Sequence, residues 1–218
     1  MAKLSASTSG TPFPETIRTD RLRIERLCHD AVDLREYYRI CSADDDIEAV
    51  TEYLSWDPHE SIRETKAFVD MVERQWENGE SAAYLLRPRD PEPGAGEIAG
   101  GTGMTVDWER GTGTLGVWLR KRFWGRGYSA ERAAAFVEVA FEHLDLDLVA
   151  VSHYPDNEKS RRAIEKYVEA HGGRREGHFR NRGVDQDGEP FDEVRYSIAR
   201  EEYESATVDR GSVIVATE

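Results

Sequence analysis

The spacing of hydrophobic residues along the chain switches between the two-residue period of strands and the 3.6-residue period of helices. From Ile17 to Leu27, apolar residues alternate with charged ones, which predicts a first strand. Ser61 and Glu64 form a capping-box pattern, and the apolar residues that follow fall on one helical face as far as Asn78-Gly79. These two patterns therefore predict a strand and a long amphipathic helix.

The rest of the chain adds several consecutive strands and then alternates strands with helices. The further predicted strands are Ala82–Leu86, Ile98–Val106, Thr114–Leu119, Leu148–Ser152, Arg174–Arg180 and Val194–Ala199. The other predicted helices are Asp30–Ile40, Ser129–His143 and Ser160–Ala170. This order favours an α/β (α+β) fold with a mixed central sheet of about six to seven strands, flanked by helices on both faces.

The length of 218 residues fits one such domain. We expect a flexible segment over 1–14, the domain over 15–200, and an irregular tail over 201–218. Met1–Pro14 lacks the apolar stretch of a secretory signal, and no apolar run approaches the roughly 20 residues that span a bilayer. The sequence therefore predicts a cytoplasmic protein without a membrane partner.

The net charge of the chain indicates which kinds of partner it can bind. The net charge is −14, and five of the 29 basic residues are lysines. An acid-rich, lysine-poor composition is typical of a protein that works in concentrated salt, where screening removes self-repulsion. No basic stripe is present, so we expect no nucleic-acid partner. Cys28 and Cys41 lack metal-ligand spacing; we interpret them as ordinary thiols and expect no metal.

The candidate ligand-binding residues lie between a predicted strand and a predicted helix, in the segment that runs from Arg122 to Ser129. Gly125 and Gly127 let the backbone approach a ligand and turn its N–H groups toward it. The start of the following helix adds unpaired N–H donors and a partial positive charge, and Arg122 and Arg126 add full charges. The segment predicts a diphosphate site, although a tight turn capped by arginines would have the same sequence.

The same segment also satisfies the dinucleotide-binding pattern Gly-x-Gly-x-x-Ala, with Asp145 and Asp147 about 20 residues later. In that fold the glycines follow the strand at once, and the acid ends the second strand. Here three basic residues intervene after Leu119, and both aspartates precede the strand Leu148–Ser152. The context disfavours a dinucleotide site.

The ordered motifs resemble the Gcn5-related N-acetyltransferase (GNAT) superfamily, specifically its RimJ/RimL-type branch of ribosomal-protein N-terminal acetyltransferases. Arg122-x-x-Gly125-x-Gly127 is similar to the signature that holds the coenzyme A diphosphate, and Asn157-Glu-Lys-Ser160 to the Asn-x-x-Ser of that branch. Thr19-Asp-Arg-Leu22 resembles the opening strand of the family. The resemblance covers about residues 17–199.

The resemblance implies a GNAT fold, acetyl-CoA as acyl donor without a metal, and a set of site residues. Trp118 and Leu119 would end the strand whose backbone holds the pantetheine arm and polarises the thioester carbonyl. Asn157 would hydrogen-bond the pantetheine, and Ser160 would protonate the departing thiolate; a role of Ser160 as helix N-cap is the alternative. The residues that would surround the diphosphate are Arg122, Gly125, Arg126, Gly127, Tyr128 and Ser129.

The chain departs from the family pattern at two places. Many members carry a tyrosine acid seven residues after the asparagine, where this chain has Ile164, and Tyr167 is out of register, so we expect it in the core. The usual Lys-Leu-Gly-Phe is replaced by a longer segment, Lys166 to Gly173, which reshapes the edge of the pocket. Ser160 is left as the acid that the resemblance implies.

These features predict an N-acetyltransferase that passes acetyl from acetyl-CoA to a primary amine, either a protein N-terminus or a small molecule. A non-catalytic acyl-CoA sensor is the alternative, because no general base is evident. The candidates for the base are Glu97, Asp107, Glu109, Glu176, His153 and Tyr154. A homodimer is expected by family analogy only.

Overall fold

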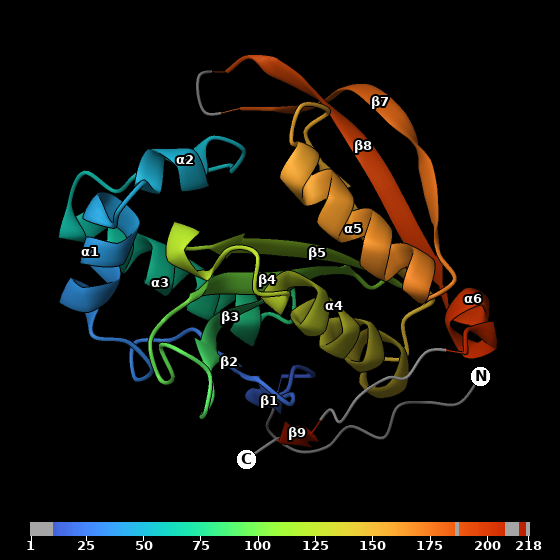
Figure 1. Cartoon of the computed structure of the whole chain (residues 1–218), viewed down its shortest axis with the longest axis horizontal. Coiled ribbons are helices and arrows are strands. Elements are labelled where there is room, and N and C mark those ends of the chain that lie inside the picture. The colour runs from blue at the N-terminus through green and yellow to red at the C-terminus, as the bar shows by residue number, and fades with distance from the viewer. Residues whose placement is uncertain (1–10, 186–187, 208–213, 217–218) are drawn as a thin grey trace.

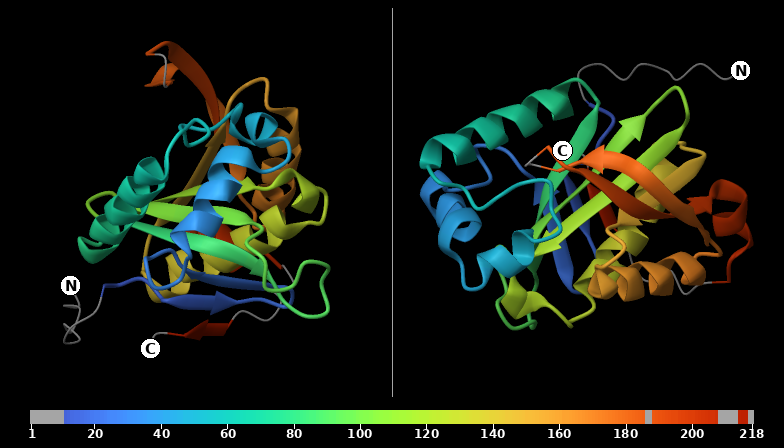
Figure 2. Two further views of the ribbon diagram at one scale, coloured as in Figure 1. Left: turned by 90° about the vertical axis from the view of Figure 1, so that its left-hand side faces the viewer. Right: turned by 90° about the horizontal axis from the view of Figure 1, so that it is seen from above.

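The computed structural model describes residues 11–185, 188–207 and 214–216. In this part of the chain, one nine-stranded sheet lies between two layers of helices (Figures 1 and 2). The strands are β1 (Thr16–Arg18), β2 (Leu22–Arg26), β3 (Ser81–Pro88), β4 (Gly100–Asp107), β5 (Thr112–Leu119), β6 (Leu148–His153), β7 (Arg174–Val184), β8 (Pro190–Ala199) and β9 (Ile214–Ala216). The helices are α1 (Leu34–Ala43), α2 (Ile47–Thr51), α3 (Ile62–Glu77), the short η1 (Lys121–Phe123), α4 (Tyr128–Glu138) with its continuation η2 (Val139–His143), α5 (Glu158–Ala170) and α6 (Arg200–Ser205).

The sheet is mixed, as the sequence predicts. Its strand order is β7-β8-β6-β5-β4-β3-β2-β1-β9, and β5 and β6 are its parallel neighbours, while the other pairs are antiparallel. The crossover from β5 to β6 runs through α4. The carboxyl ends of β5 and β6 therefore meet at one edge of the sheet, where α4 begins.

The predicted fold class is confirmed, but six to seven strands was an undercount. The single strand expected over Ile17–Leu27 is the hairpin β1–β2, closed by the Thr19 side chain, whose Oγ1 accepts a hydrogen bond from the Leu22 amide at 3.0 Å. Ile17 and Leu22 are five residues apart and both lie in the same core. An odd spacing cannot keep both on one face of a continuous strand, so the turn at residues 19–21 is what brings both into the core.

The core consists of two hydrophobic clusters, one on each face of the sheet. Adjacent residues of β3 take opposite sides, with Leu86 in the cluster under α4 and α5, and Leu85 in the cluster under α1 and α3. Tyr167 is 3% exposed and belongs to the first cluster, which confirms it as a core residue. The predicted helix at Asp30–Ile40 instead begins after Asp33, whose side chain accepts hydrogen bonds from the amides of Arg35 and Glu36.

Both ends of the chain contribute more structure than the sequence predicts. The tail expected to be irregular contains α6, and its strand β9 pairs with β1. Of the segment 1–14, residues 1–10 lie outside the described part, but Phe13 is buried against Trp76, with ring centroids 5.4 Å apart. Within the described ranges, we find no helix that combines the length and apolarity needed to cross a bilayer.

Candidate active site

The parallel pair β5–β6 opens toward the carboxyl ends of its strands. Pairing covers Thr112–Leu115 with Leu148–Val151, and β5 then continues through residues 116–119 with β4 as its partner on the other side. In the described chain, no strand pairs with this second half of β5 on the side that faces β6. Ligands of α/β sheets bind outside the carboxyl ends of parallel strands, so this opening is the first candidate site.

The loop after β5 presents a run of backbone amides at the opening. Gly125 (φ +75°) and Gly127 (φ +81°) adopt the left-handed conformation, and Gly127 is the N-cap of α4. Among the residues described, none accepts a hydrogen bond from the backbone N–H groups of residues 125–129. Five successive free donors at a helix start form an anion-binding nest, reinforced by the helix dipole.

Space at the nest also suits a ligand. A Cβ built at Gly125 would meet no atom within 4 Å, and the same holds for Gly116 in the second half of β5. The side chains of Trp118 and Leu119 turn away into the two hydrophobic clusters, so these residues can offer their backbone. The residues present therefore fit a diphosphate and an extended arm lying along β5.

The arginines of the loop lie beside the nest. The guanidinium groups of Arg122 and Arg126 lie over the Phe123 ring, each 4.8 Å from its centroid. Arg122 pairs with Glu97, and Arg126 donates to the carbonyl oxygens of Pro93 and Arg122 at 2.8 and 3.0 Å. Both cations are thus held at the loop by ring contacts and hydrogen bonds.

Arg21 is a further cation at this point that the sequence analysis did not identify as a site residue. Its backbone N–H and its Nε donate to the Glu131 carboxylate at 2.8 and 2.7 Å, and its Nη1 donates to the Arg126 carbonyl oxygen at 2.9 Å. A Cβ on Gly127 would lie 3.3 Å from Arg21 Nη2. The Thr-Asp-Arg-Leu motif carried the signal, but the sequence alone does not show that the β1–β2 turn touches α4.

Tyr128 and Ser129 differ in what they can offer. The Tyr128 ring is buried and its hydroxyl donates to Glu92 Oε2 at 2.7 Å, so the residue presents its backbone amide to the nest. Burial, and then the bond to Glu92, raise the pKa of Tyr128. Ser129 is half-buried in the first turn of α4.

Asn157 and Ser160 lie at the start of α5, across the opening. Asn157 is the N-cap, and its Oδ1 accepts from the Ser160 amide at 3.0 Å. The capping role considered for Ser160 therefore falls to Asn157, whose Nδ2 remains a donor. Within the described chain, no partner is bonded to the Ser160 hydroxyl, which is half-buried. Lys159, between them, reaches back to the loop, with its Nζ 4.3 Å from the centre of the Trp124 ring.

Four of the candidate bases either lie far from the opening or are already bonded to another side chain. Asp107 and Glu109 lie at the amino end of β5, about 23 Å along the strand from Leu119. Glu97 is the ion-pair partner of Arg122, and the Glu176 carboxylate accepts from Ser197 in the neighbouring strand. Asp107 and Glu109 therefore lie too far from this opening to act in it.

His153 and Tyr154 lie at the carboxyl end of β6, at the opening. His153 Nδ1 is 2.7 Å from the carbonyl oxygen of Tyr154, and a carbonyl only accepts, so Nδ1 carries the proton. In the neutral ring Nε2 is then the unprotonated nitrogen. It is buried and bonds to no atom of the described residues. His153 is the candidate base whose position and protonation fit the task.

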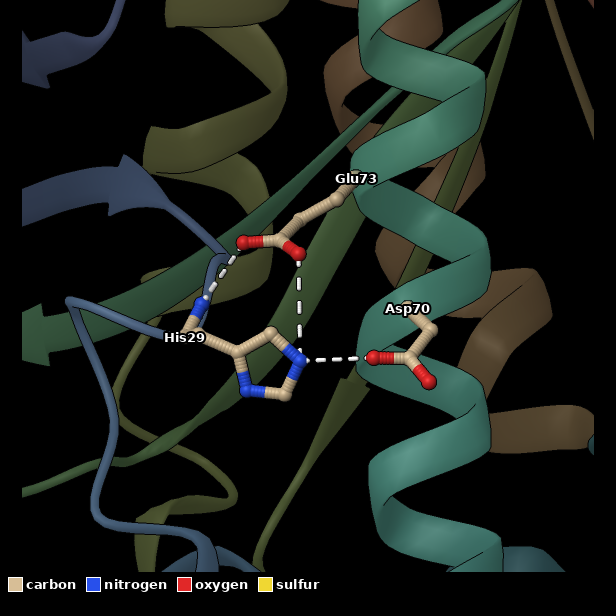
Figure 3. A group of neighbouring side chains, drawn as sticks. All are labelled: His29, Asp70 and Glu73. Atoms are coloured by element: carbon tan, nitrogen blue, oxygen red, sulfur yellow. Dashed lines mark hydrogen bonds and ion pairs between the residues drawn. The ribbon is translucent and has the colours of Figure 1, made fainter.

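One group of side chains has the composition of a metal site, but it lies on the other face of the sheet. His29, Asp70 and Glu73 bring ligand atoms within 4.8 Å of one another (Figure 3). His29 Nε2 contacts Asp70 Oδ1 at 2.7 Å, and the Lys66 ammonium lies 2.7 Å from the same carboxylate. These contacts make an ion-pair cluster that joins the loop after β2 to α3.

Comparison with known proteins agrees with this geometry. Residues 21–167 match the domain family described as "Acetyltransferase (GNAT) domain". The uncharacterized N-acetyltransferase p20 of Bacillus licheniformis is 22% identical over 147 residues, which are 67% of this chain and 77% of p20. The uncharacterized N-acetyltransferase YnaD of Bacillus subtilis (strain 168) is 28% identical over 140 residues, 64% of this chain and 75% of YnaD.

Among solved structures, Mycobacterium smegmatis RimJ in complex with CoA-disulfide has a TM-score of 0.72 at 17% identity, covering 91% of this chain and 94% of RimJ. The fold and the nest at the opening between β5 and β6 define an acyl-CoA-dependent N-acetyltransferase. The chain belongs to the acetyltransferase (GNAT) domain family, which confirms the family predicted from the loop motif. At 17% identity, the likeness to RimJ shows that the two proteins share a fold.

Proposed function

We propose that this enzyme transfers acetyl from acetyl-CoA to a primary amine, on a protein N-terminus or a small molecule, at the opening between β5 and β6. The observation that carries the proposal is the run of five free amides at residues 125–129 beside three arginines. A diphosphate on this nest would direct the rest of the donor along the free side of β5.

Different residues of the opening would have different roles in the reaction. The backbone of residues 116–119 offers polar groups without a strand partner to the pantetheine arm and the thioester carbonyl. The amine nitrogen forms a bond to the carbonyl carbon and loses a proton, while the bond from that carbon to sulfur breaks. The Ser160 hydroxyl, free of the capping role, supplies the proton to the sulfur.

Whether the reaction needs a strong general base depends on the pKa of the acceptor amine. An α-amine with a pKa near 7.8 is roughly a tenth neutral at pH 7, whereas a lysine amine with a pKa near 10.4 is almost wholly protonated. The difference is about 3.5 kcal/mol that an enzyme acting on lysine must supply. His153 Nε2 is unprotonated in this tautomer but buried, so it would take a proton from an acceptor amine through a bridging water and not directly.

The rival function is an acyl-CoA sensor that keeps the nest without the chemistry. Calorimetry with CoA and a thiol-release assay with acetyl-CoA and a panel of amines separate the two. The proposal expects binding of CoA and thiol release that requires an amine. Binding without thiol release from any amine would favour the sensor, and absence of CoA binding would contradict both functions.

A further inference from the structure

Three aromatic side chains from distant parts of the sequence meet beside the opening. Tyr154 follows β6 directly, and its ring stacks on Phe191 of β8, with centroids 4.4 Å apart. Tyr53, just after α2, lies 5.9 Å from Tyr154 at an interplanar angle of 53°. Tyr53, Tyr154 and Phe191 form what we call the aromatic cluster, which joins the loop after α2 to the β7–β8 hairpin. Figure 1 shows the ribbons of α2, β7 and β8.

The backbone is shaped to hold the cluster. Phe191 pairs in register with Gly183 of β7, and a Cβ at Gly183 would lie 2.3 Å from the Phe191 ring. Only a residue without a side chain lets that ring lie across the hairpin and reach Tyr154. The angle between Tyr53 and Tyr154 keeps their faces from covering each other, and both rings are half-buried. Both side chains therefore keep some surface that a ligand can contact.

Carboxylates surround the same rings. The charges of Glu52 and Asp156 contribute to a raised pKa of Tyr53, after the effect of desolvation, and Asp185 does the same for Tyr154. We call Glu52, Asp156 and Asp185 the acidic group. Within residues 11–185, 188–207 and 214–216, no lysine or arginine forms an ion pair with any of the three.

Three cations of the surrounding elements already have carboxylate partners. Lys121 pairs with Asp46 at 2.7 Å, Arg120 pairs with Asp44, and Arg182 pairs with Glu193 at 3.2 Å. Glu52, Asp156 and Asp185 have no such partner in the described chain, so the acidic group leaves a negative charge beside partly exposed aromatic rings. A cation gains from both, because a positive charge is attracted to the face of an aromatic ring and to nearby carboxylates.

We propose that the acceptor carries a second positive group besides the amine that is acetylated, and that the aromatic cluster and the acidic group bind this second cation. The amine that attacks the thioester must be neutral, so the charge recognised at this place belongs to another atom of the acceptor. The substrate class is a dicationic amine, such as an alkyl diamine or a peptide whose residue after the N-terminus is basic. This inference rests on the proposed function, because it assigns that site its acceptor.

Two matched pairs of acceptors test the proposal. Putrescine is compared with n-butylamine, and a Ser-Lys-Ala peptide with its Ser-norleucine-Ala analogue, which lacks only the ammonium group. We expect kcat/KM to favour the charged member of at least one pair by about tenfold, and the pair that shows it identifies the source of the amine. Calorimetry with the same ligands on CoA-saturated protein should show the same preference in Kd.

Substitutions in the aromatic cluster and the acidic group test whether these residues cause the preference for the charged acceptor. Tyr154→Leu, Gly183→Ala and Glu52→Gln should each reduce the preference for the charged ligand severalfold, whereas Tyr154→Phe, which keeps the ring, should retain it. Tyr38→Leu is the control, since Tyr38 is a half-buried tyrosine of α1 whose hydroxyl bonds to the Glu60 carbonyl oxygen. Calorimetry with CoA verifies that each variant still folds and binds the donor.

The outcomes separate this inference from the proposed function. Loss of the preference in the cluster variants alone supports the inference. Equal kcat/KM and equal Kd within both pairs, on a protein that binds CoA and releases thiol, would overturn the inference and leave the acetyltransferase intact. A protein that does not bind CoA would overturn the proposed function first.

Discussion

The two sides of the opening are built by different means. On the β5 side, the loop from Arg120 to Ser129 offers mainly backbone, held open by Gly125 and Gly127. On the β6 side, the aromatic cluster and the acidic group offer side chains that come from the loops after α2, β6 and β7, and from β8. Apart from Arg21, the donor side is thus one contiguous segment, whereas the acceptor side is assembled from several.

This difference explains how the two sides can change. Amides that bind a diphosphate depend on backbone conformation, which tolerates few substitutions where φ is positive. Side chains on separate loops can be exchanged one at a time without loss of the donor site. We therefore expect the β5 side to fix the chemistry of the donor and the β6 side to select the acceptor.

The largest effect should follow from a methyl group on the nest. Gly125→Ala places a Cβ in the open space at the nest and forces an alanine to a φ of +75°. Loss of two charge-assisted hydrogen bonds, about 3 kcal/mol together, should weaken CoA binding about 100-fold in calorimetry. Gly79→Ala is the matched control, because Gly79 also has a positive φ (+69°) and lies at the end of α3. If both variants bound CoA equally well, the nest would not be the donor site.

An effect of similar size, on kcat instead of CoA binding, is expected on the opposite side of the opening. Ser160→Ala removes the hydroxyl that would protonate the thiolate and should lower kcat about 100-fold, while the Kd for CoA stays within about twofold. Asn157→Ala tests the neighbouring cap and should lower the free energy of unfolding by about 1 kcal/mol. An unchanged kcat in Ser160→Ala would mean that the proton comes from another group.

The sequence predicted the donor side far better than the acceptor side. Gly125, Gly127 and the arginines stand within a few residues of one another, so a local pattern shows what the backbone there can do. Tyr53, Tyr154 and Phe191 have no spacing in common, and their meeting depends on the β7–β8 hairpin and on the loop after α2. For the same reason Arg21 was missed, because its contact with Glu131 joins residues 110 positions apart.

The fold shows the same division. Strands and helices with a clear period were predicted to within a few residues, because burial on one face imposes the period. The β1–β2 hairpin and the pairing of β9 with β1 were not, since a turn closed by one threonine and a distant edge pairing leave little trace in local periodicity.

A modest effect is expected where the two sides touch. Lys159 of α5 lies over the Trp124 ring of the donor loop, so this contact spans the opening. Lys159→Met keeps the stem and removes the charge, and it should raise the dissociation rate of CoA about threefold. Lys66→Met on α3 serves as the comparison. A rate unchanged in both variants would show that the contact does not hold the two sides together.

The smallest effect should come from the ion-pair cluster on the other face of the sheet (Figure 3). Hydrogen bonds from Lys66, and then from His29, lower the pKa of Asp70. A carboxyl with a lowered pKa stabilises the fold above its unfolded value of about 3.9, and this contribution is lost as the pH falls through the folded-state pKa. Asp70→Asn should therefore lower Tm slightly at pH 7, with the difference from the wild type shrinking below about pH 4. Neither CoA binding nor acceptor preference should change.

The most direct test of the account is a crystal structure of the protein with bound CoA. We expect diphosphate oxygens at about 2.9 Å from amide nitrogens of residues 125–129, with the pantetheine arm along the second half of β5. A diphosphate bound elsewhere, or amides of this loop turned toward the protein interior, would contradict the assignment of the donor site on which the other proposals depend.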